Sequence, residues 1–571
     1  MQNTGFTFLL VLVTFVQVLP ASAQHGRRPV PAEHGMVVTT HHLASQVGVD
    51  ILESGGNAVD AAVATTFALA VVFPAAGNVG GGGFLMYHGA DGEVTAFNFR
   101  EKAPLAATVD MFVGPDGMPD AANRHVNLLS TGVPGTVAGL VLAHKRLGSL
   151  PWADLVEPAV RLARDGFPYS WDMRTTGDWL RSLAENDPVY DATVAQFTKG
   201  DEGNYAPGEL FRQPDLARTL ERIRDGGHDG FYRGETARLV ADFMRRHGGL
   251  ITEEDLARYE AQELTPVHGT YRGYDVYGMP PPSSGGIATV TMLNILEEFD
   301  LARAGHNSAA YLHLLTEAMR RAFADRAQYV GDMDFNPSLP LAELTSKVHA
   351  KRLRSTIDLL AASESDSSAF NGVHVQESEQ TTHFSIVDAD GNTVSMTYTL
   401  EQGYGNKIVV EGAGFLLNNE MGDFNPVPGH TDRRGNIGTK PNQVAPEKRM
   451  LSSMTPTILA KDGRPFMAIG SPGGRTIINT VVQVILNVVD HGMDIAEAVE
   501  APRIHHQWLP DRTSFEPGIS PDTRRLYEMM GHEVYDRGRQ GRAMGIVVDP
   551  ETGIRWGAAD SRSFDGRAIG Y

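Results

Sequence analysis

Apolar residues recur at helical spacing in three long stretches of the chain. Residues 57–72 are rich in Ala and Val, which predicts a helix that is packed on every side. Residues 308–328 place Leu312, Leu315 and Met319 near helical spacing, with charged residues on the other faces, and this predicts a second helix. A third helix is predicted over residues 477–489, where an apolar run ends shortly before a glycine.

Towards the C-terminus the pattern changes to strands and hairpins. Asp-Gly pairs at positions 390–391 and 462–463 separate runs that are apolar or alternate between apolar and polar residues, and a similar pair stands at 91–92. Asp-Gly favours tight turns because glycine adopts positive φ angles without strain. Helices that alternate with hairpins predict an α+β fold, in which helices cover an antiparallel sheet.

Two further stretches have the composition of loops. Residues 361–368 (AASESDSS) are rich in serine and acidic residues, which is typical of an exposed loop. Residues 280–286 (PPPSSGG) join a rigid turn to a flexible one, and their composition equally fits a plain connector. We find no convincing internal repeat.

The N-terminus carries an apolar run over residues 6–20, followed by the small residues Ala21, Ser22 and Ala23. This order predicts a signal peptide over residues 1–23, although the first five residues contain no Lys or Arg; a buried N-terminal helix is the alternative. The later sequence has no uninterrupted apolar stretch of membrane-spanning length. We therefore expect an exported protein, periplasmic or secreted, with no membrane span after signal removal.

Composition narrows the classes of function. The chain has 571 residues and a formal net charge of -20, which argues against nucleic acid as a partner because phosphate backbones select for clustered Lys and Arg. It has no cysteine, so disulfides, thiolate nucleophiles and zinc-thiolate sites are excluded. This composition fits an enzyme that acts on small molecules better than a nucleic-acid-binding protein.

Several short motifs fail the tests for cofactor or metal sites. The four glycines at positions 80–83 lack the Gly-Lys-Ser/Thr ending of a phosphate loop, and close backbone packing is the better interpretation. Residues 388–392 have their glycine at the fourth position rather than the sixth of a calcium loop, so a hairpin turn is predicted. The His pairs at 41–42 and 505–506 lack the i, i+4 spacing of a helical zinc site. We expect neither a metal nor a cofactor.

The remaining candidate for chemistry is the segment TTHFSIVDADGNTVSMTYTL, residues 381–400. Thr-Thr before an alternating run is in itself only β-prone sequence. A threonine hydroxyl is a poor nucleophile without a neighbouring base. A threonine at a chain terminus carries its own base, since an α-amino group titrates near about 8. Composition does not show whether the chain is cut there.

TTHFS at residues 381–385 resembles the start of the small subunit of γ-glutamyltranspeptidases, which are N-terminal nucleophile hydrolases. Other segments resemble the same family in the same order, from about His34 to Tyr571. They are GGNAVDAAVA (55–64), GNVGGGGF (77–84), FREKAP (99–104), GVPGTVAGL (132–140), LLNNEMGDF (416–424), LSSMTPT (451–457), GSPGG (470–474) and APRIHHQWLPD (501–511). Each is weak alone, but the ordered set is specific.

The resemblance implies a four-layer αββα sandwich built jointly by two autoprocessed subunits. Thr381 would attack the Gln380–Thr381 link through an ester, giving a large subunit of residues 24–380 and a small subunit of residues 381–571 that stay together as a heterodimer. Thr381 would then attack the γ-glutamyl carbonyl of substrates such as glutathione, with transfer to water or to an amino acid or peptide. Thr399 would position its hydroxyl, and the N–H groups of Gly473 and Gly474 would form the oxyanion hole.

The resemblance also implies the groups that bind substrate. Arg100 would hold the α-carboxylate with help from Ser452 and Ser453. Asp423 and Glu420 would hold the α-ammonium. Taken singly, the two acidic residues equally fit a solvated turn, and the serine pair equally fits a helix start.

The chain departs from the family pattern at three places. Glu401 stands where many members have Asn and is expected to contact the amine, Gly422 replaces a common acidic residue, and Arg434 stands in the lid-like loop 425–449 about where some members carry a shielding Tyr. Two alternatives stay open: a glutaryl-cephalosporin-type acylase on the same scaffold, and a secreted non-enzymatic protein that never matures. Arg100, Asp423 and the lid favour an α-amino acid substrate over a glutaryl group, and the intact set of site residues argues against an inert scaffold.

Overall fold

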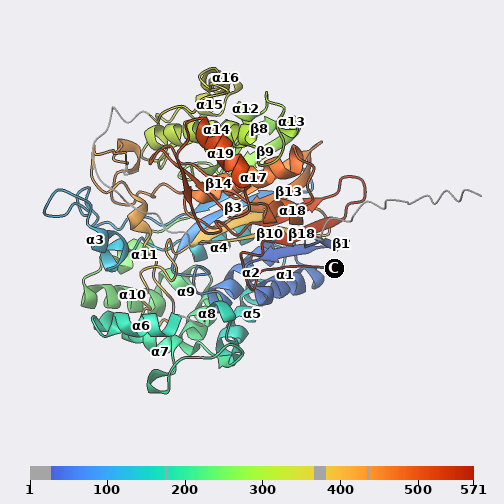
Figure 1. Cartoon of the computed structure of the whole chain (residues 1–571). Coiled ribbons are helices and arrows are strands. Elements are labelled where there is room, and N and C mark those ends of the chain that lie inside the picture. Colours follow the sequence, from blue (N-terminus) through green and yellow to red (C-terminus); the bar gives the residue numbers. More distant parts are fainter. Residues whose placement is uncertain (1–26, 174–175, 366–380, 434–436) are drawn as a thin grey trace, which may run out of the picture.

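The structure is a computed structural model that describes residues 27–173, 176–365, 381–433 and 437–571 (Figure 1). The predicted signal peptide over residues 1–23, Gln380 and Arg434 lie outside the described residues. Of the predicted loop 361–368, the structure describes the part that ends at Ser365.

Two seven-stranded antiparallel sheets form the centre of the molecule. The first sheet has the order β1 (Val30–Ala32), β18 (Arg555–Ala559), β17 (Met544–Val548), β13 (Arg464–Gly470), β12 (Thr457–Lys461), β9 (Tyr274–Gly278) and β8 (Val267–Tyr271). The second sheet has the order β19 (Arg567–Gly570), β2 (Met36–Thr39), β10 (Thr382–Val387), β11 (Thr393–Thr399), β3 (Gly82–His88), β4 (Val94–Phe99) and β7 (Gln262–Leu264).

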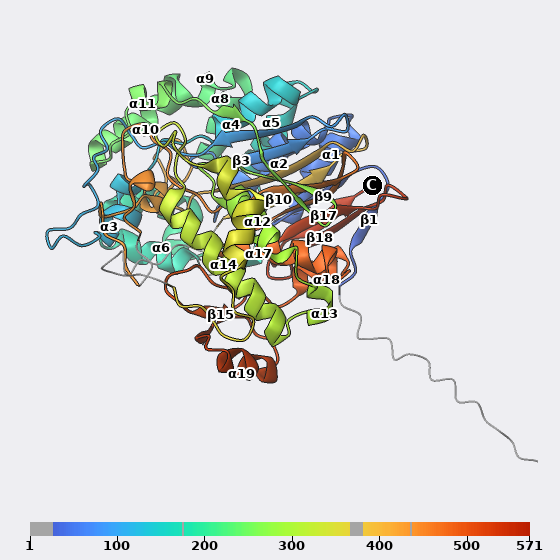
Figure 2. The same ribbon diagram turned by 90° about the horizontal axis from the view of Figure 1, so that it is seen from above.

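Helices cover the outer face of each sheet, as Figures 1 and 2 show. The first sheet is covered by α12 (Gly285–Leu296), α17 (Thr476–Val489) and α18 (Ile495–Glu500), with α14 (Ala309–Tyr329) packed on α12. The second sheet is covered by α1 (His42–Glu53), α2 (Ala58–Val72) and α4 (Thr136–Leu147), with α5 (Trp152–Asp165) and α8 (Pro214–Gly226) outside them. The predicted four-layer αββα sandwich is confirmed.

Shorter elements surround the sandwich. The further helices are α3 (Ala121–His125), α6 (Thr176–Ala184), α7 (Asp191–Phe197), α9 (Asp229–Tyr232), α10 (Gly234–His247), α11 (Glu253–Ala257), α13 (Leu301–Ala304), α15 (Leu341–Leu344), α16 (Lys347–Arg354) and α19 (Pro521–Met529). The 3-10 helices are η1 (Leu128–Ser130), η2 (Trp171–Met173), η3 (Pro188–Tyr190), η4 (Gly200–Glu202), η5 (Glu420–Asp423) and η6 (Lys440–Asn442). The small sheets comprise β5 (Phe167–Pro168) with β6 (Leu210–Phe211), and β14 (Ile504–His505), β15 (Thr513–Phe515) and β16 (Val534–Asp536).

The three predicted helices are confirmed as α2, α14 and α17. Helix α2 starts after Asn57, whose side chain accepts from the N–H groups of Val59 and Asp60 while Asp60 accepts from the Asn57 N–H, so that a capping box closes the first turn. Every residue of α2 is buried, because the helix lies between the second sheet and the helices outside it. Ser308 caps α14 in a similar way by accepting from the Tyr311 N–H.

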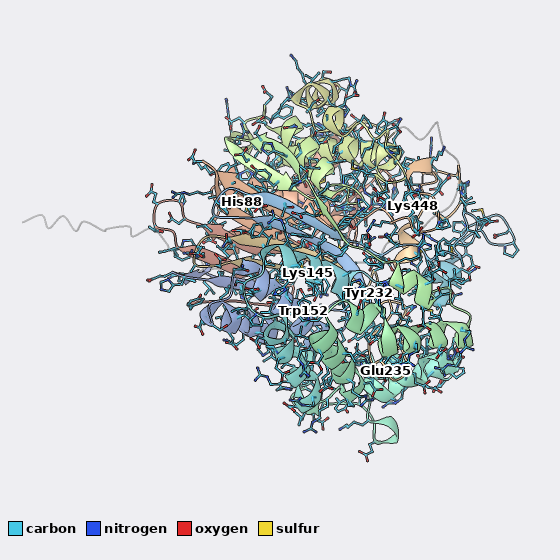
Figure 3. All side chains as sticks on the ribbon, turned by 180° about the vertical axis from the view of Figure 1, so that it is seen from behind. His88, Lys145, Trp152, Tyr232, Glu235 and Lys448 are labelled. Carbon is cyan, nitrogen blue, oxygen red and sulfur yellow. The ribbon has the colours of Figure 1, made fainter. Side chains whose placement is uncertain are left out.

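The predicted Asp-Gly turns are also confirmed. They join β3 to β4, β10 to β11 and β12 to β13, and Gly92, Gly391 and Gly463 all have positive φ angles. The helical layers are held by specific contacts as well. Trp152, labelled in Figure 3, packs edge-on against Phe67 of α2 and donates from Nε1 to the Ile223 carbonyl of α8 at 2.9 Å.

Strands from both sides of Thr381 are interleaved in both sheets. In the first sheet, β1, β8 and β9 precede Thr381 in the chain and the other four strands follow it. In the second sheet, β10 and β11 lie between β2 and β3, which both precede Thr381. Each sheet is therefore completed only by both parts of the chain.

Among the described helices, none combines the length and apolar character needed to cross a bilayer.

Candidate active site

Thr381 stands immediately before β10, at the end of the β10–β11 hairpin. The register pairs Thr382 with Tyr398, so Thr381 faces Thr399 at the end of β11. Thr381 Oγ1 donates a hydrogen bond to Thr399 Oγ1 at 3.3 Å, and Thr399 Oγ1 also accepts from the Glu401 N–H at 2.9 Å. Both threonines are buried. The hairpin geometry thus brings together two residues that are 18 positions apart in the chain.

The four-glycine run packs its backbone directly against this hairpin, as the sequence predicts. A Cβ atom on Gly81 would lie 2.1 Å from the Thr399 carbonyl oxygen, and one on Gly83 would lie 2.4 Å from Tyr398 Cβ. Asn78 fixes the turn before the run, since its Oδ1 accepts from the Gly81 N–H at 2.9 Å. The glycines are therefore needed for close approach to the strand that carries Thr399.

Arg100 lies at the end of β4 and is fully buried. Its guanidinium donates to the carboxylates of Glu420 and Asp423, both on η5, and to the carbonyls of Met450 and Leu451 at 3.3 Å. A third carboxylate, that of Glu101, lies 3.5 Å from Nη1. The Arg100 cation is therefore surrounded by three carboxylates of the protein itself.

These side chains meet around one small cavity of about 30 Å³, the size of roughly one water molecule. Its lining brings together most of the predicted site residues: Arg100, Thr381, Thr399, Glu401, Glu420, Asp423, Ser452, Ser453 and Gly474, with Met454 and Ile477. The cavity is much smaller than a γ-glutamyl group. The described chain thus brings the predicted site residues together around a small cavity.

The charge around the cavity is strongly acidic. Burial raises the pKa values of the Glu101 and Glu420 carboxyls, and the nearby Arg100 opposes this shift. Both oxygens of Glu101 and Oε2 of Glu420 are buried without a hydrogen-bond partner among the described residues. One arginine faces several carboxyls, so the site favours a ligand that brings a further positive charge.

The alternative interpretations for the acidic and serine residues are both wrong. Glu420 is buried on η5 rather than in a solvated turn, and Asp423 has a side chain that is only 17% exposed. Ser452 and Ser453 lie outside any described helix. Ser453 Oγ accepts from Arg326 of α14 at 2.9 Å, and Ser452 Oγ accepts from the Met454 N–H.

Residues 280–286 support the serine pair and are more than a connector. Ser284 donates to the Ser452 carbonyl from both its N–H at 2.8 Å and its Oγ at 2.7 Å. Ser283 Oγ donates to the Met454 carbonyl at 2.7 Å. The whole stretch is buried, and it forms the wall behind Ser452 and Ser453.

Gly473 and Gly474 form the turn that leads into α17. Their φ angles are 138° and 56°, in the region that favours glycine. The Gly473 carbonyl accepts from Thr476 Oγ1 at 2.7 Å, which closes the first turn of the helix, and Gly474 lines the cavity. The loop therefore lies at a helix N-terminus, where backbone N–H groups stabilise negative charge, and Gly474 lines the same cavity as Thr381.

Several residues that organise the site carry no predicted role. Asn78 Nδ2 donates to the Thr399 carbonyl, and Asn418 Nδ2 donates to the carbonyls of Gly80 and Gly132 while its Oδ1 accepts from the Glu420 N–H. Arg326 holds both Ser284 and Ser453. Asn78 and Asn418 lie in the GNVGGGG and LLNN segments, so their position in these motifs is the sequence signal that could have identified them as site residues.

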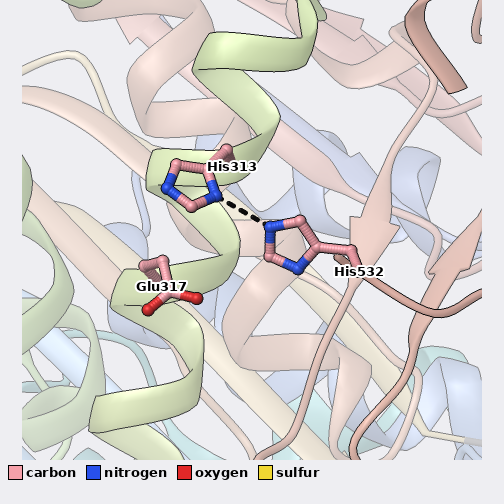
Figure 4. Close-up of side chains that lie close together, drawn as sticks. All are labelled: His313, Glu317 and His532. Carbon is pink, nitrogen blue, oxygen red and sulfur yellow. Dashed lines mark hydrogen bonds between the residues drawn. The ribbon is translucent and has the colours of Figure 1, made fainter. Parts of the chain in front are cut away.

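The His pair at 505–506 is bound to protein groups in the structure. His505 Nδ1 contacts Asn479 and His506 Nε2 contacts Asp511, so both rings are bound to protein groups. Elsewhere in the described chain, His313, Glu317 and His532 each offer a possible metal-ligand atom, and these three atoms lie within 4.8 Å of one another (Figure 4). The two rings share a 2.8 Å hydrogen bond. Glu317 binds Arg320, Arg321 and Ser363, so its oxygens are already used by donors.

A threonine at the head of an inner strand of an αββα sandwich, beside a glycine turn and a buried Arg-carboxylate cluster, defines the class of N-terminal nucleophile hydrolases. The chain belongs to the gamma-glutamyltranspeptidase family, whose model matches residues 44–571. It is 47% identical over 547 residues to the glutathione hydrolase proenzyme of Escherichia coli (strain K12), covering 95% of this chain and 93% of that protein.

Two solved structures extend the comparison. Helicobacter pylori gamma-glutamyltranspeptidase is 42% identical, with a TM-score of 0.54, over 60% of this chain and 95% of that one. The cephalosporin acylase from Bacillus halodurans is 29% identical, with a TM-score of 0.84, over 98% of this chain and 99% of that one. The resemblance inferred from the ordered motifs is therefore confirmed, and the chain is similar to both transpeptidases and acylases.

Proposed function

We propose that this protein is an autoprocessing γ-glutamyltransferase and glutathione hydrolase. The observation that carries the proposal is the 3.3 Å contact between the Thr381 and Thr399 hydroxyls at the edge of the cavity that Arg100, Glu420 and Asp423 line. Similarity to proteins named glutathione hydrolase proenzyme supports both the substrate class and the processing step.

In the first step, Thr381 Oγ adds to the carbonyl carbon of the Gln380–Thr381 link. The C–N bond breaks, the nitrogen takes the hydroxyl proton and becomes the α-amine of Thr381, and an ester joins the two parts. Water then hydrolyses the ester to a carboxylate and the free hydroxyl. The products are a large subunit of residues 24–380 and a small subunit of residues 381–571, which remain a heterodimer because they share both sheets.

In the second step, the new α-amine of Thr381 takes the proton of its own hydroxyl, which attacks the γ-glutamyl carbonyl. The N–H groups of Gly473 and Gly474 stabilise the oxyanion, and the proton passes to the departing amine. Water or the amino group of an acceptor then attacks the γ-glutamyl ester and frees Thr381. Threonine, amine and backbone donors supply the acyl-transfer groups without a cofactor.

Substrate selection follows from the charges. Arg100, with Ser452 and Ser453, would bind the α-carboxylate, and Glu420, Asp423 and Glu401 would attract the α-ammonium. The cavity of about 30 Å³ is small for this group, so we expect processing to widen the site. The predicted signal peptide over residues 1–23 would direct the precursor out of the cytoplasm, to the periplasm or the medium.

The proposal is tested by the intact mass of purified protein, wild type beside Thr381→Ala. We expect two wild-type fragments, the smaller beginning at Thr381, and one uncut chain from the variant. A wild type that folds but stays whole would favour the inert scaffold instead.

The similarity to a cephalosporin acylase makes a glutaryl substrate the second candidate. A γ-glutamyl anilide and a glutaryl anilide differ by the α-ammonium alone, so they separate the two activities. The buried carboxyl groups predict that the γ-glutamyl compound is strongly preferred, and the reverse preference would assign the protein to the acylases.

A further inference from the structure

His125, the last residue of α3, faces Glu401 at the border of the cavity. His125 Nδ1 lies 3.6 Å from Glu401 Oε2, and the side chains are 12% and 5% exposed. Among the described residues, neither nitrogen of His125 nor Oε2 of Glu401 has a hydrogen-bond partner. Buried polar atoms are seldom left in this state unless they serve a ligand, water or a change of charge.

The backbone around His125 is built to hold the ring in this place. A Cβ atom on Gly422 would lie 2.4 Å from both Cε1 and Nδ1 of His125, so only glycine leaves space for the imidazole. Asn419 Nδ2 donates to the His125 carbonyl at 2.9 Å, and Arg124 donates to the Gly422 carbonyl. Helix α3 is thus fastened to η5, the element that carries Glu420 and Asp423.

Glu401 is the carboxylate of the cavity that does not contact Arg100 in any described hydrogen bond or ion pair. Its backbone has φ 76°, an unusual value for a residue with a side chain, and its N–H donates to Thr399 Oγ1. The strained turn is therefore tied to the reacting hydroxyls and directs the Glu401 side chain to the cavity wall. Its described ion-pair partner is the His125 ring, which carries a positive charge when it is protonated.

We infer that His125 is a specificity-determining residue that acts through Glu401, an inference that rests on the proposed function. Neutral His125 leaves the Glu401 carboxylate available to the α-ammonium of the γ-glutamyl group. Protonated His125 pairs with Glu401 and competes with that ammonium. The charge of the His125 ring therefore decides how strongly Glu401 attracts the substrate ammonium.

Burial raises the pKa of the Glu101 carboxyl to about 7 and also raises that of Glu420, so the comparison of His125→Gln with the wild type is needed to separate the contribution of His125 from theirs. Arg124 precedes His125 on α3 and keeps its charge. Glu420 and Asp423, from η5, are paired with Arg100. Burial lowers the pKa of Lys407, and the nearby Glu401 carboxylate opposes that shift.

The test is the KM of processed enzyme for a γ-glutamyl anilide between pH 5.5 and 8.5, in the wild type, His125→Gln, Glu401→Gln and the double variant. We expect the wild-type KM to fall several-fold as the pH rises, and His125→Gln to flatten this dependence while kcat changes less. In the Glu401→Gln background, His125→Gln should leave KM unchanged, because the group through which it acts is gone. His247→Gln, an exposed histidine on α10, is the matched control.

Equal KM changes in both backgrounds, or a loss of melting temperature and kcat with an unaltered KM profile, would give His125 a structural role only. Should His125→Gln not fold, His125→Asn takes its place in the same comparison, and a wild-type KM that does not change with pH contradicts the inference in either case. Wild-type enzyme without γ-glutamyl hydrolysis at any pH would instead contradict the proposed function.

Discussion

Asn78 Nδ2 donates a hydrogen bond to the Thr399 carbonyl oxygen at 2.9 Å, across more than three hundred residues of chain. The same side chain accepts from the Gly81 N–H and from Thr136 Oγ1. One buried amide thus fastens β11, the glycine run and the start of α4 to each other. The position of the Thr399 hydroxyl depends on this junction.

Asn78→Ala should therefore slow processing and lower kcat, with a smaller effect on KM. It leaves the Gly81 N–H and the Thr399 carbonyl without their partner, which costs about 1–3 kcal/mol of stability. The fraction cleaved over time, followed by gel or mass, measures the first effect and the melting temperature measures the second. Asn186→Ala, whose side chain donates to Ser182 on an exposed helix, provides the control and should process normally.

Gly81→Ala should destabilise the protein by about 2 kcal/mol or more, because the added methyl group meets the Thr399 carbonyl at 2.1 Å. The strand carrying Thr399 would have to move, so processing should fail or slow greatly. Gly226→Ala is the matched control, since a Cβ there meets no atom within 4 Å. Equal unfolding free energies of the two variants would contradict the close packing.

Arg100→Lys should raise KM for γ-glutamyl substrates by roughly tenfold or more. Lysine keeps the charge but loses the forked geometry, and a lost hydrogen bond to a charged group is worth about 1.5–3 kcal/mol. The charge that remains should preserve the fold, since Glu420 and Asp423 still face a cation. Steady-state kinetics measures the effect, and an unchanged KM would remove Arg100 from substrate binding.

Acidification should destabilise the protein through buried histidines. Burial lowers the pKa of His383 from its ordinary value of 6.5 to about 3, and its ring contacts Thr397 and Ser385 at 2.8 and 3.2 Å. Between these two values the unfolded chain binds a proton at His383 and the folded chain does not. Stability is therefore lost as the pH falls from 6.5 towards 3.

The slope is at most about 1.4 kcal/mol per pH unit for each such histidine. Chemical unfolding of the uncut Thr381→Ala chain at several pH values measures it. His383→Asn should flatten the profile in this window, whereas exposed His247→Asn should not. An unaltered slope in His383→Asn would show that His383 titrates alike in both states.

Local features of the fold could be read from the sequence. Helices α2, α14 and α17 were predicted within one residue at each end, because apolar spacing and capping residues act over a few positions. The Asp-Gly turns followed for the same reason. The strand order could not be predicted in this way, because β19 pairs with β2 and β1 pairs with β18, across almost the whole chain.

The candidate site shows the same limit. Thr381, Arg100 and the glycine pair stand in recognisable motifs, and all but Gly473 among the predicted residues of the described chain line the cavity. The pairing of Arg100 with Glu420 and Asp423 was not predicted, because it depends on where the folded chain places η5 relative to Arg100. His125 belongs to no motif, and its contact with Glu401 arises only where α3 meets η5.

The interleaving of strands from both sides of Thr381 has a consequence for the lifetime of the processed enzyme. An uncut chain that unfolds can refold by a search within one molecule. Two separate fragments must first meet, at concentrations far below the roughly millimolar effective concentration that a tether supplies. Cutting the chain would therefore make each unfolding event nearly irreversible, so that the durability of the mature enzyme is governed by its unfolding barrier.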